Sequence, residues 1–96
     1  MLHTTIYKYE LRPGETHINM PAGAKVLTTA SQQDKVFIWA EVDPAAETVT
    51  KRIFQAFATG QIIRQGMGIS REYIGTVHMG PMNCNLVFHI YEYTGV

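Results

Sequence analysis

Along almost the whole chain, apolar and polar residues alternate in short runs that end at glycine, proline, asparagine or aspartate. Alternation with a period of two places successive side chains on opposite faces of a β-strand, whereas an amphipathic helix requires a period of 3.6. The turn signals recur every eight to twelve residues, which is the spacing typical of small all-β folds. The sequence therefore predicts an all-β protein, a small antiparallel β-sandwich or partly closed barrel of six to seven strands.

Several segments have the composition of strands. They cover residues 4–11, 17–20, 25–31, 36–42, 48–59, 72–79 and 84–93. The clearest is 36–42, which carries Phe37 and Trp39 on one face and smaller apolar residues on the other, so we expect it to be covered on both faces. The residues 32–34 predict a hairpin loop before this strand, and we expect segment 48–59 to pair with it as the following hairpin.

The chain length corresponds to a single domain, residues 1–96, in which about two-thirds of the extended-chain surface can be buried. An alternative is an α+β fold in which residues 43–50 form one helix, although Asp43-Pro44 favours a stop and the following segment is short for a helix by itself. Hydrophobic residues make up 46% of the chain. A surplus of apolar surface on so small a domain favours a subunit interface, and we therefore expect a homo-oligomer.

The charge balance narrows the classes of partner. Eight basic and eight acidic residues give a net charge of zero, which argues against binding of duplex nucleic acid or of an anionic membrane by long-range attraction. No run approaches the roughly 20 apolar residues of a membrane span, and the first residues lack the pattern of a secretory signal, so we expect a cytoplasmic protein. Cys84 is the single cysteine, and we interpret it as a small buried apolar residue.

Catalytic motifs are missing from the sequence. It contains no nucleophile elbow, no phosphate-binding loop and no dinucleotide fingerprint, and its histidines are not at metal-ligand spacings. We therefore expect no enzymatic activity, no cofactor and no metal, and we interpret His89 as a half-buried, hydrogen-bonded residue. A metal-dependent phosphodiesterase or nucleotide hydrolase stays open as an alternative; its ligands would come from His17, His78 or His89 with Asp43 or Glu72.

The remaining chemistry is that of a binding site. The segment 60–71 breaks the alternation with three glycines and two arginines, and such loops present backbone N–H groups and can close over a ligand. Aromatic rings stack on bases and arginine pairs with phosphate. The predicted ligand-binding residues are Trp39 or Tyr73 as the stacking ring, Lys25, Arg52, Arg64 and Arg71 as phosphate ligands, and Thr59 and Gly60 at the start of the loop.

Several motifs carry a resemblance to a known group of proteins. They are Met20-Pro21-Ala22-Gly23-Ala24-Lys25-Val26-Leu27, Trp39-Ala40-Glu41-Val42-Asp43-Pro44, Ala58-Thr59-Gly60, Tyr73-Ile74-Gly75-Thr76-Val77 and Leu86-Val87-Phe88-His89. With these motifs the chain resembles, over nearly its whole length, a widespread family of short uncharacterised phage and prophage proteins. It departs from that family's Gly-Thr-Gly-His-Pro stretch, because Gln61 follows Gly60 here.

The resemblance implies a class of function. Small phage-encoded β-proteins without catalytic residues are similar, as a class, to the proteins with which phages sequester nucleotide signals of bacterial immunity, such as cyclic dinucleotides and cyclic ADP-ribose variants. On this basis we expect a phage-type anti-defence binding protein that works in the host cytoplasm. The alternative is a protein-interaction module that inhibits a host protein or acts in phage assembly through an exposed strand edge or aromatic patch.

Overall fold

The computed structural model describes residues 3–80 and 86–95. These residues form seven strands: β1 (Thr5–Leu11), β2 (Gly14–Pro21), β3 (Lys25–Gln32), β4 (Lys35–Val42), β5 (Val49–Ala58), β6 (Arg71–His78) and β7 (Val87–Tyr93). Every strand pair is antiparallel, and no helix occurs in the described ranges. The prediction of an all-β fold is confirmed.

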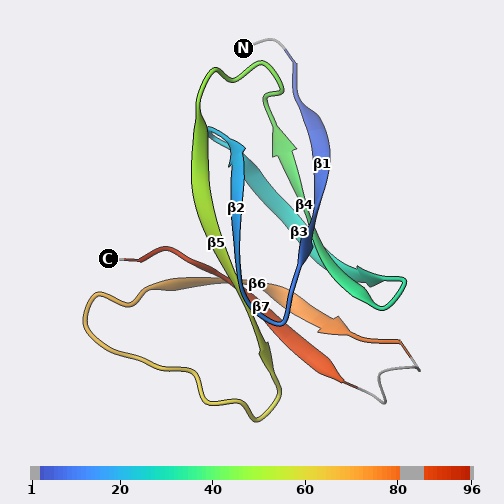
Figure 1. Ribbon diagram of the computed structural model, residues 1–96, viewed down its shortest axis with the longest axis vertical. Helices are drawn as coiled ribbons and strands as arrows, with labels where there is room; N and C mark the ends of the chain where they lie inside the picture. The colour runs from blue at the N-terminus through green and yellow to red at the C-terminus, as the bar shows by residue number, and fades with distance from the viewer. Residues whose placement is uncertain (1–2, 81–85, 96) are drawn as a thin grey trace.

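The strands form two sheets that pack on each other without closing into a barrel (Figure 1). One sheet has the order β1-β4-β3, and the other has the order β2-β5-β7-β6. At one seam between the sheets the edge strands β3 and β6 approach each other, so that a Cβ atom on Gly75 would lie 2.9 Å from Cγ2 of Thr29. Both strands carry a bulge, at Leu27 in β3 and at Ile74 in β6. A bulge disrupts ladder hydrogen bonding and bends the strand, so β3 and β6 lie side by side at this seam without pairing into one sheet.

The core lies between the two sheets. Its residues belong to the inward-pointing faces that the alternation in the sequence predicts. In β4, the residues Val36, Ile38, Ala40 and Val42 all point inward and are buried. They pack with side chains of the opposite sheet. The buried apolar residues are Leu11, Met20, Ala24, Val36, Ile38, Ala40, Val42, Phe54, Ala56, Val77, Phe88 and Ile90.

The expectation that segment 36–42 is covered on both faces is wrong for its outer face. Phe37 and Trp39 pack side by side there, with ring centroids 6.1 Å apart, but both stay partly exposed. The fold has two layers, so the outer face of the three-stranded sheet has no third layer within the described residues. Lys8 covers part of it, because its ammonium group lies 4.6 Å from the centroid of Phe37.

The connections on either side of β4 differ from each other. Gln33 and Asp34 both have positive φ, 52° and 62°, which is the geometry of a type I′ hairpin turn, so the predicted hairpin loop is confirmed. The expected hairpin between β4 and β5 is wrong, because β1 and β3 occupy both edges of β4 and the chain crosses to the second sheet. The crossing segment makes a turn in which Ala46 donates to the carbonyl of Asp43. The alternative helix over 43–50 does not form.

Cys84 and most of the turn expected at residues 80–83 lie outside the described residues. Within the described ranges, no helix has the length and apolar character needed to cross a membrane.

Candidate functional site

The two sheets separate the predicted ligand-binding residues into three places. Trp39 lies on the outer face of the three-stranded sheet, beside Phe37. Lys25 and Arg52 line a groove between the sheets. The remaining residues gather at the outer face of the four-stranded sheet and the loop beside it; they are Thr59, Gly60, Arg64, Arg71 and Tyr73.

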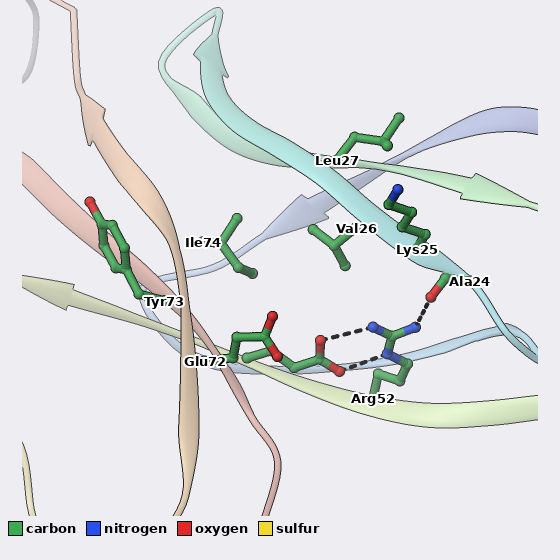
Figure 2. A pocket seen from close by; sticks show the side chains of 9 residues that line it. Ala24, Lys25, Val26, Leu27, Arg52, Glu72, Tyr73 and Ile74 are labelled. Carbon is green, nitrogen blue, oxygen red and sulfur yellow. Dashed lines mark hydrogen bonds and ion pairs between the residues drawn. The ribbon is translucent and has the colours of Figure 1, made fainter.

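The inter-sheet groove opens where β3 and β6 diverge (Figure 2). It has a volume of about 490 Å³. Val26 and Ile74 face each other across it, and Arg52 lies at its base (Figure 2). The residues that line the groove are Ala24, Lys25, Val26, Leu27, Arg52, Glu72, Tyr73, Ile74 and Glu92.

Arg52 is already engaged within the protein. Its Nε and a terminal nitrogen donate to the two carboxylate oxygens of Glu92, at 2.6 and 2.8 Å, and its other terminal nitrogen donates to the carbonyl of Ala24. The hydrogen bonds to Glu92 raise the pKa of Arg52 above its ordinary value; partial burial opposes the shift, and the charges of Glu92 and Glu72 add to it. A guanidinium with these bonds has little capacity left to bind a phosphate.

The groove as a whole has balanced charge. Glu72 and Glu92 are directly opposite each other on β6 and β7, and together with Arg52 and Lys25 they give two negative and two positive side chains. Opposed carboxylates repel, so Arg52 compensates a local excess of negative charge. This composition is poorly suited to capture of an anion.

The second candidate site is the aromatic face, which we define as the outward-pointing side chains Phe57, Arg71, Tyr73, Thr76, His89 and Tyr91 of the four-stranded sheet. Along β5 and β7 these positions alternate with core residues, which puts them on one face. On β6 the bulge at Ile74 brings Tyr73 and Thr76, three positions apart, to the same face, opposite Tyr91 and His89. The ring of Tyr91 is central. Its centroid lies 5.9 Å from that of Phe57 and 5.4 Å from that of Tyr73, in edge-on contacts.

Tyr73 is the accessible ring of this group. It is 55% exposed, whereas Phe57 and Tyr91 are half-buried. Tyr73 also borders the inter-sheet groove, because it lies on the edge strand β6 beside the bulge at Ile74. A ligand with a flat ring can therefore stack on Tyr73, whose own ring is held by the edge-on contact with Tyr91.

Arg71 contacts both the aromatic face and the loop of residues 59–70. Its Nε donates to the side-chain oxygen of Gln55 at 2.6 Å, and its Nη1 donates to the carbonyl of Arg64 at 2.9 Å. The guanidinium carbon lies 5.5 Å from the ring centroid of Phe57, a cation–π distance. No carboxylate of the described residues forms an ion pair with Arg71. In contrast to Arg52, it keeps an uncompensated positive charge.

His89 connects the loop to the sheet. Its Nε2 lies 2.8 Å from Oγ1 of Thr59 and its Nδ1 lies 3.1 Å from Oγ1 of Thr76, and Thr76 in turn shares a hydrogen bond with the hydroxyl of Tyr73. The interpretation of His89 as half-buried and hydrogen-bonded is confirmed. One chain of hydrogen bonds thus links the first residue of the loop to the exposed ring.

Sequence reasoning did not select Gln55, Phe57, Thr76 and Tyr91 as parts of this site. Alternation puts Gln55 and Phe57 on one face of β5 and His89 and Tyr91 on one face of β7. The missing information was that β5 and β7 are neighbours, with Gln55 opposite Tyr91 and Phe57 opposite His89.

Metal-ligating side chains do not assemble in the described ranges, where no group of three His, Cys, Asp or Glu residues could hold an ion. His17 instead lies 2.6 Å from a carboxylate oxygen of Glu15 on β2, and His89 is held by two threonines. The ligand set named for a metal-dependent phosphodiesterase is therefore dispersed over the fold.

Comparison with known proteins identifies a family for the chain but no function. No curated protein and no solved structure matches the chain. One family model, described as a domain of unknown function (DUF7352), matches residues 2–95, and this confirms the expectation of an uncharacterised family, while the phage origin stays a prediction. The chain belongs to the DUF7352 family.

Proposed function

We propose that this protein is a non-catalytic binding protein that captures a small nucleotide-like anion on the aromatic face of its four-stranded sheet. The observation that carries the proposal is the uncompensated charge of Arg71, held over Phe57 beside an exposed tyrosine ring. A sheet face with exposed aromatic rings and a nearby cation supports binding of a base and its phosphate, since stacking and ionic attraction then act together.

In the proposed complex the base stacks on Tyr73 and a phosphate binds Arg71. The loop of residues 59–70 adds the exposed side chain of Arg64. Lys25 and Arg52, in the inter-sheet groove, are not part of this binding mode, and neither is Trp39 on the other sheet.

The resemblance to phage and prophage proteins extends the proposal to a biological role. A cytoplasmic protein that holds a cyclic dinucleotide or a cyclic ADP-ribose variant would remove this signal from a bacterial immune pathway without chemistry. This extension depends on sequence motifs alone, whereas the binding of a nucleotide-like anion depends on Arg71 and the rings around it.

The test is calorimetric titration of the protein with a panel of cyclic dinucleotides, cyclic ADP-ribose variants and linear mononucleotides. At least one should bind, and Arg71→Gln should weaken its binding at least about tenfold, because a hydrogen bond to a charged group contributes about 1.5–3 kcal/mol. Tyr73→Ala should weaken it by about the same factor through loss of stacking, which is worth about 1–3 kcal/mol.

Two exposed residues away from the aromatic face serve as matched controls. Arg12→Gln changes an exposed arginine in the turn between β1 and β2, and Tyr7→Ala changes a tyrosine on β1 that is 41% exposed. Neither should alter the affinity. Absence of heat with every compound in the panel, or equal losses in the controls and in Arg71→Gln, would contradict the proposal.

A further inference from the structure

The four sheet edges of the fold differ in how well they are protected against pairing with another strand. β3 and β6 face each other across the seam and each contains a bulge, and β2 ends in Pro21, which cannot donate a ladder hydrogen bond. β1 has none of these features. It pairs with β4 in unbroken register over all its residues, from Thr5 to Leu11, and lies at the outer margin of the fold (Figure 1).

The side chains of β1 are also unusually exposed for a strand of a sandwich. The residues from Thr5 to Lys8 are all exposed, and Ile6 is 57% exposed on the outer face of the sheet. A regular, exposed edge with an apolar side chain is a template for pairing with another strand, and such edges are normally blocked in proteins that stay monomeric.

The charges on β1 select the partner. Lys8 and Glu10 point to the same face, two positions apart. When two copies of β1 pair antiparallel with Tyr9 opposite Tyr9 of the second copy, each Lys8 lies opposite Glu10 of the other copy, which gives two pairs of opposite charge. Centring the pair on Lys8 or on Glu10 instead brings like charges together, so one register is favoured and its neighbours are not.

Both charged side chains are available for this contact. Glu10 makes no hydrogen bond or ion pair within the described residues. Lys8 donates to the neutral side-chain oxygen of Gln32 at 3.0 Å and lies over the ring of Phe37. A carboxylate can replace these exposed contacts, since charged acceptors bind an ammonium group more strongly.

We infer that β1 is the edge through which two copies of this chain associate, as an antiparallel, two-fold symmetric pair centred on Tyr9. The joined sheet has the order β3-β4-β1 followed by β1-β4-β3 of the second copy. Its outer face brings the Phe37 and Trp39 rings of both copies to one side of a continuous six-stranded surface, while both aromatic faces stay free.

Charge exchange tests this register directly. In sedimentation equilibrium, the wild-type chain should form a dimer. Lys8→Glu and Glu10→Lys should each raise the dimer dissociation constant about tenfold or more, because attraction turns into repulsion at two places. The double variant K8E/E10K restores both pairs with inverted sign and should return the dissociation constant to within about threefold of wild type. The matched controls K51E and E47K, at exposed positions outside β1, should leave it unchanged.

Hydrogen exchange supplies a measurement without substitutions. The β1 amides that point away from β4 should become protected as the wild-type concentration rises, and amides of β2 should not. A wild-type chain that stays monomeric, a double variant that associates no better than the single variants, or controls that weaken the dimer equally would overturn the inference.

Discussion

Arg52 on β5 and Glu92 on β7 hold each other through two hydrogen bonds between the guanidinium and the carboxylate, at 2.6 and 2.8 Å. Their side chains are 19% and 16% exposed. Because Arg52 also donates to the carbonyl of Ala24, the pair ties the four-stranded sheet to the start of β3 at the base of the groove in Figure 2. The contact is a structural link between the sheets.

Arg52→Ala should therefore lower the free energy of unfolding by about 2 kcal/mol, because it leaves the Glu92 carboxylate without its partner and opposite Glu72. Urea denaturation followed by tryptophan fluorescence measures the change. Arg64→Ala, which alters an exposed arginine side chain in the loop, serves as the control and should change stability by less than about 0.5 kcal/mol. Equal losses in the two variants would contradict the structural role of Arg52.

The close approach of β3 and β6 leads to a second prediction, on the stability of a Gly75 variant. Gly75→Ala places a Cβ atom 2.9 Å from Cγ2 of Thr29, and Thr29 cannot easily turn away because its hydroxyl donates to the carbonyl of Phe37 at 2.8 Å. We expect a loss of about 1–2 kcal/mol in thermal or urea unfolding. Thr29→Ser removes the methyl group and keeps the hydroxyl, so G75A should cost clearly less in that background. An unchanged cost would mean that Thr29 is not the obstacle.

The ion pair on β2 predicts a dependence of stability on pH. Hydrogen bonds from His17 and, second, from Gln55 lower the pKa of Glu15 below its ordinary value of 4.5. A lowered pKa in the folded state stabilises the fold above pH 4.5, and this contribution disappears as the pH falls through the folded-state pKa. Glu15→Gln should remove it, and since the Glu15 side chain is 50% exposed, the difference should be only about 0.5 kcal/mol.

The measurement for Glu15 is the free energy of unfolding in urea at several pH values on both sides of 4.5. Wild type and E15Q should differ at neutral pH and converge in acid. Glu47→Gln, at an exposed position in the turn before β5, is the matched control and should follow wild type. A difference that persists or grows toward low pH would contradict the assignment.

The hydrogen bonds of His89 lead to a prediction about amide exchange in the loop of residues 59–70. His89→Ala removes the hydrogen bonds to Thr59 and Thr76 and should speed amide exchange at residues 59–61, with a loss of about 1 kcal/mol in stability. His78→Ala, at an exposed position of β6, should leave exchange in the loop unchanged. Unaltered exchange in His89→Ala would show that the loop is anchored by its backbone contacts alone.

The sequence determined the strands and most of their faces. Alternation in segment 36–42 marked Val36, Ile38, Ala40 and Val42 as one face, and that face is buried. The positions of glycine, proline and aspartate marked the turns, including the hairpin at 33–34. These features are local, because backbone geometry alone sets the period of two and the turn conformations.

Only the tertiary structure decided which strands are neighbours and which charges are compensated. Segment 48–59 has the same pattern whether it pairs with β4, as expected, or with β2 and β7, as it does. Arg52 and Arg71 have the same predicted role as phosphate ligands, yet Arg52 meets Glu92, which is 40 positions away, and Arg71 meets neutral acceptors. An ion pair depends on distance in space, and sheet topology, which local alternation does not encode, sets that distance.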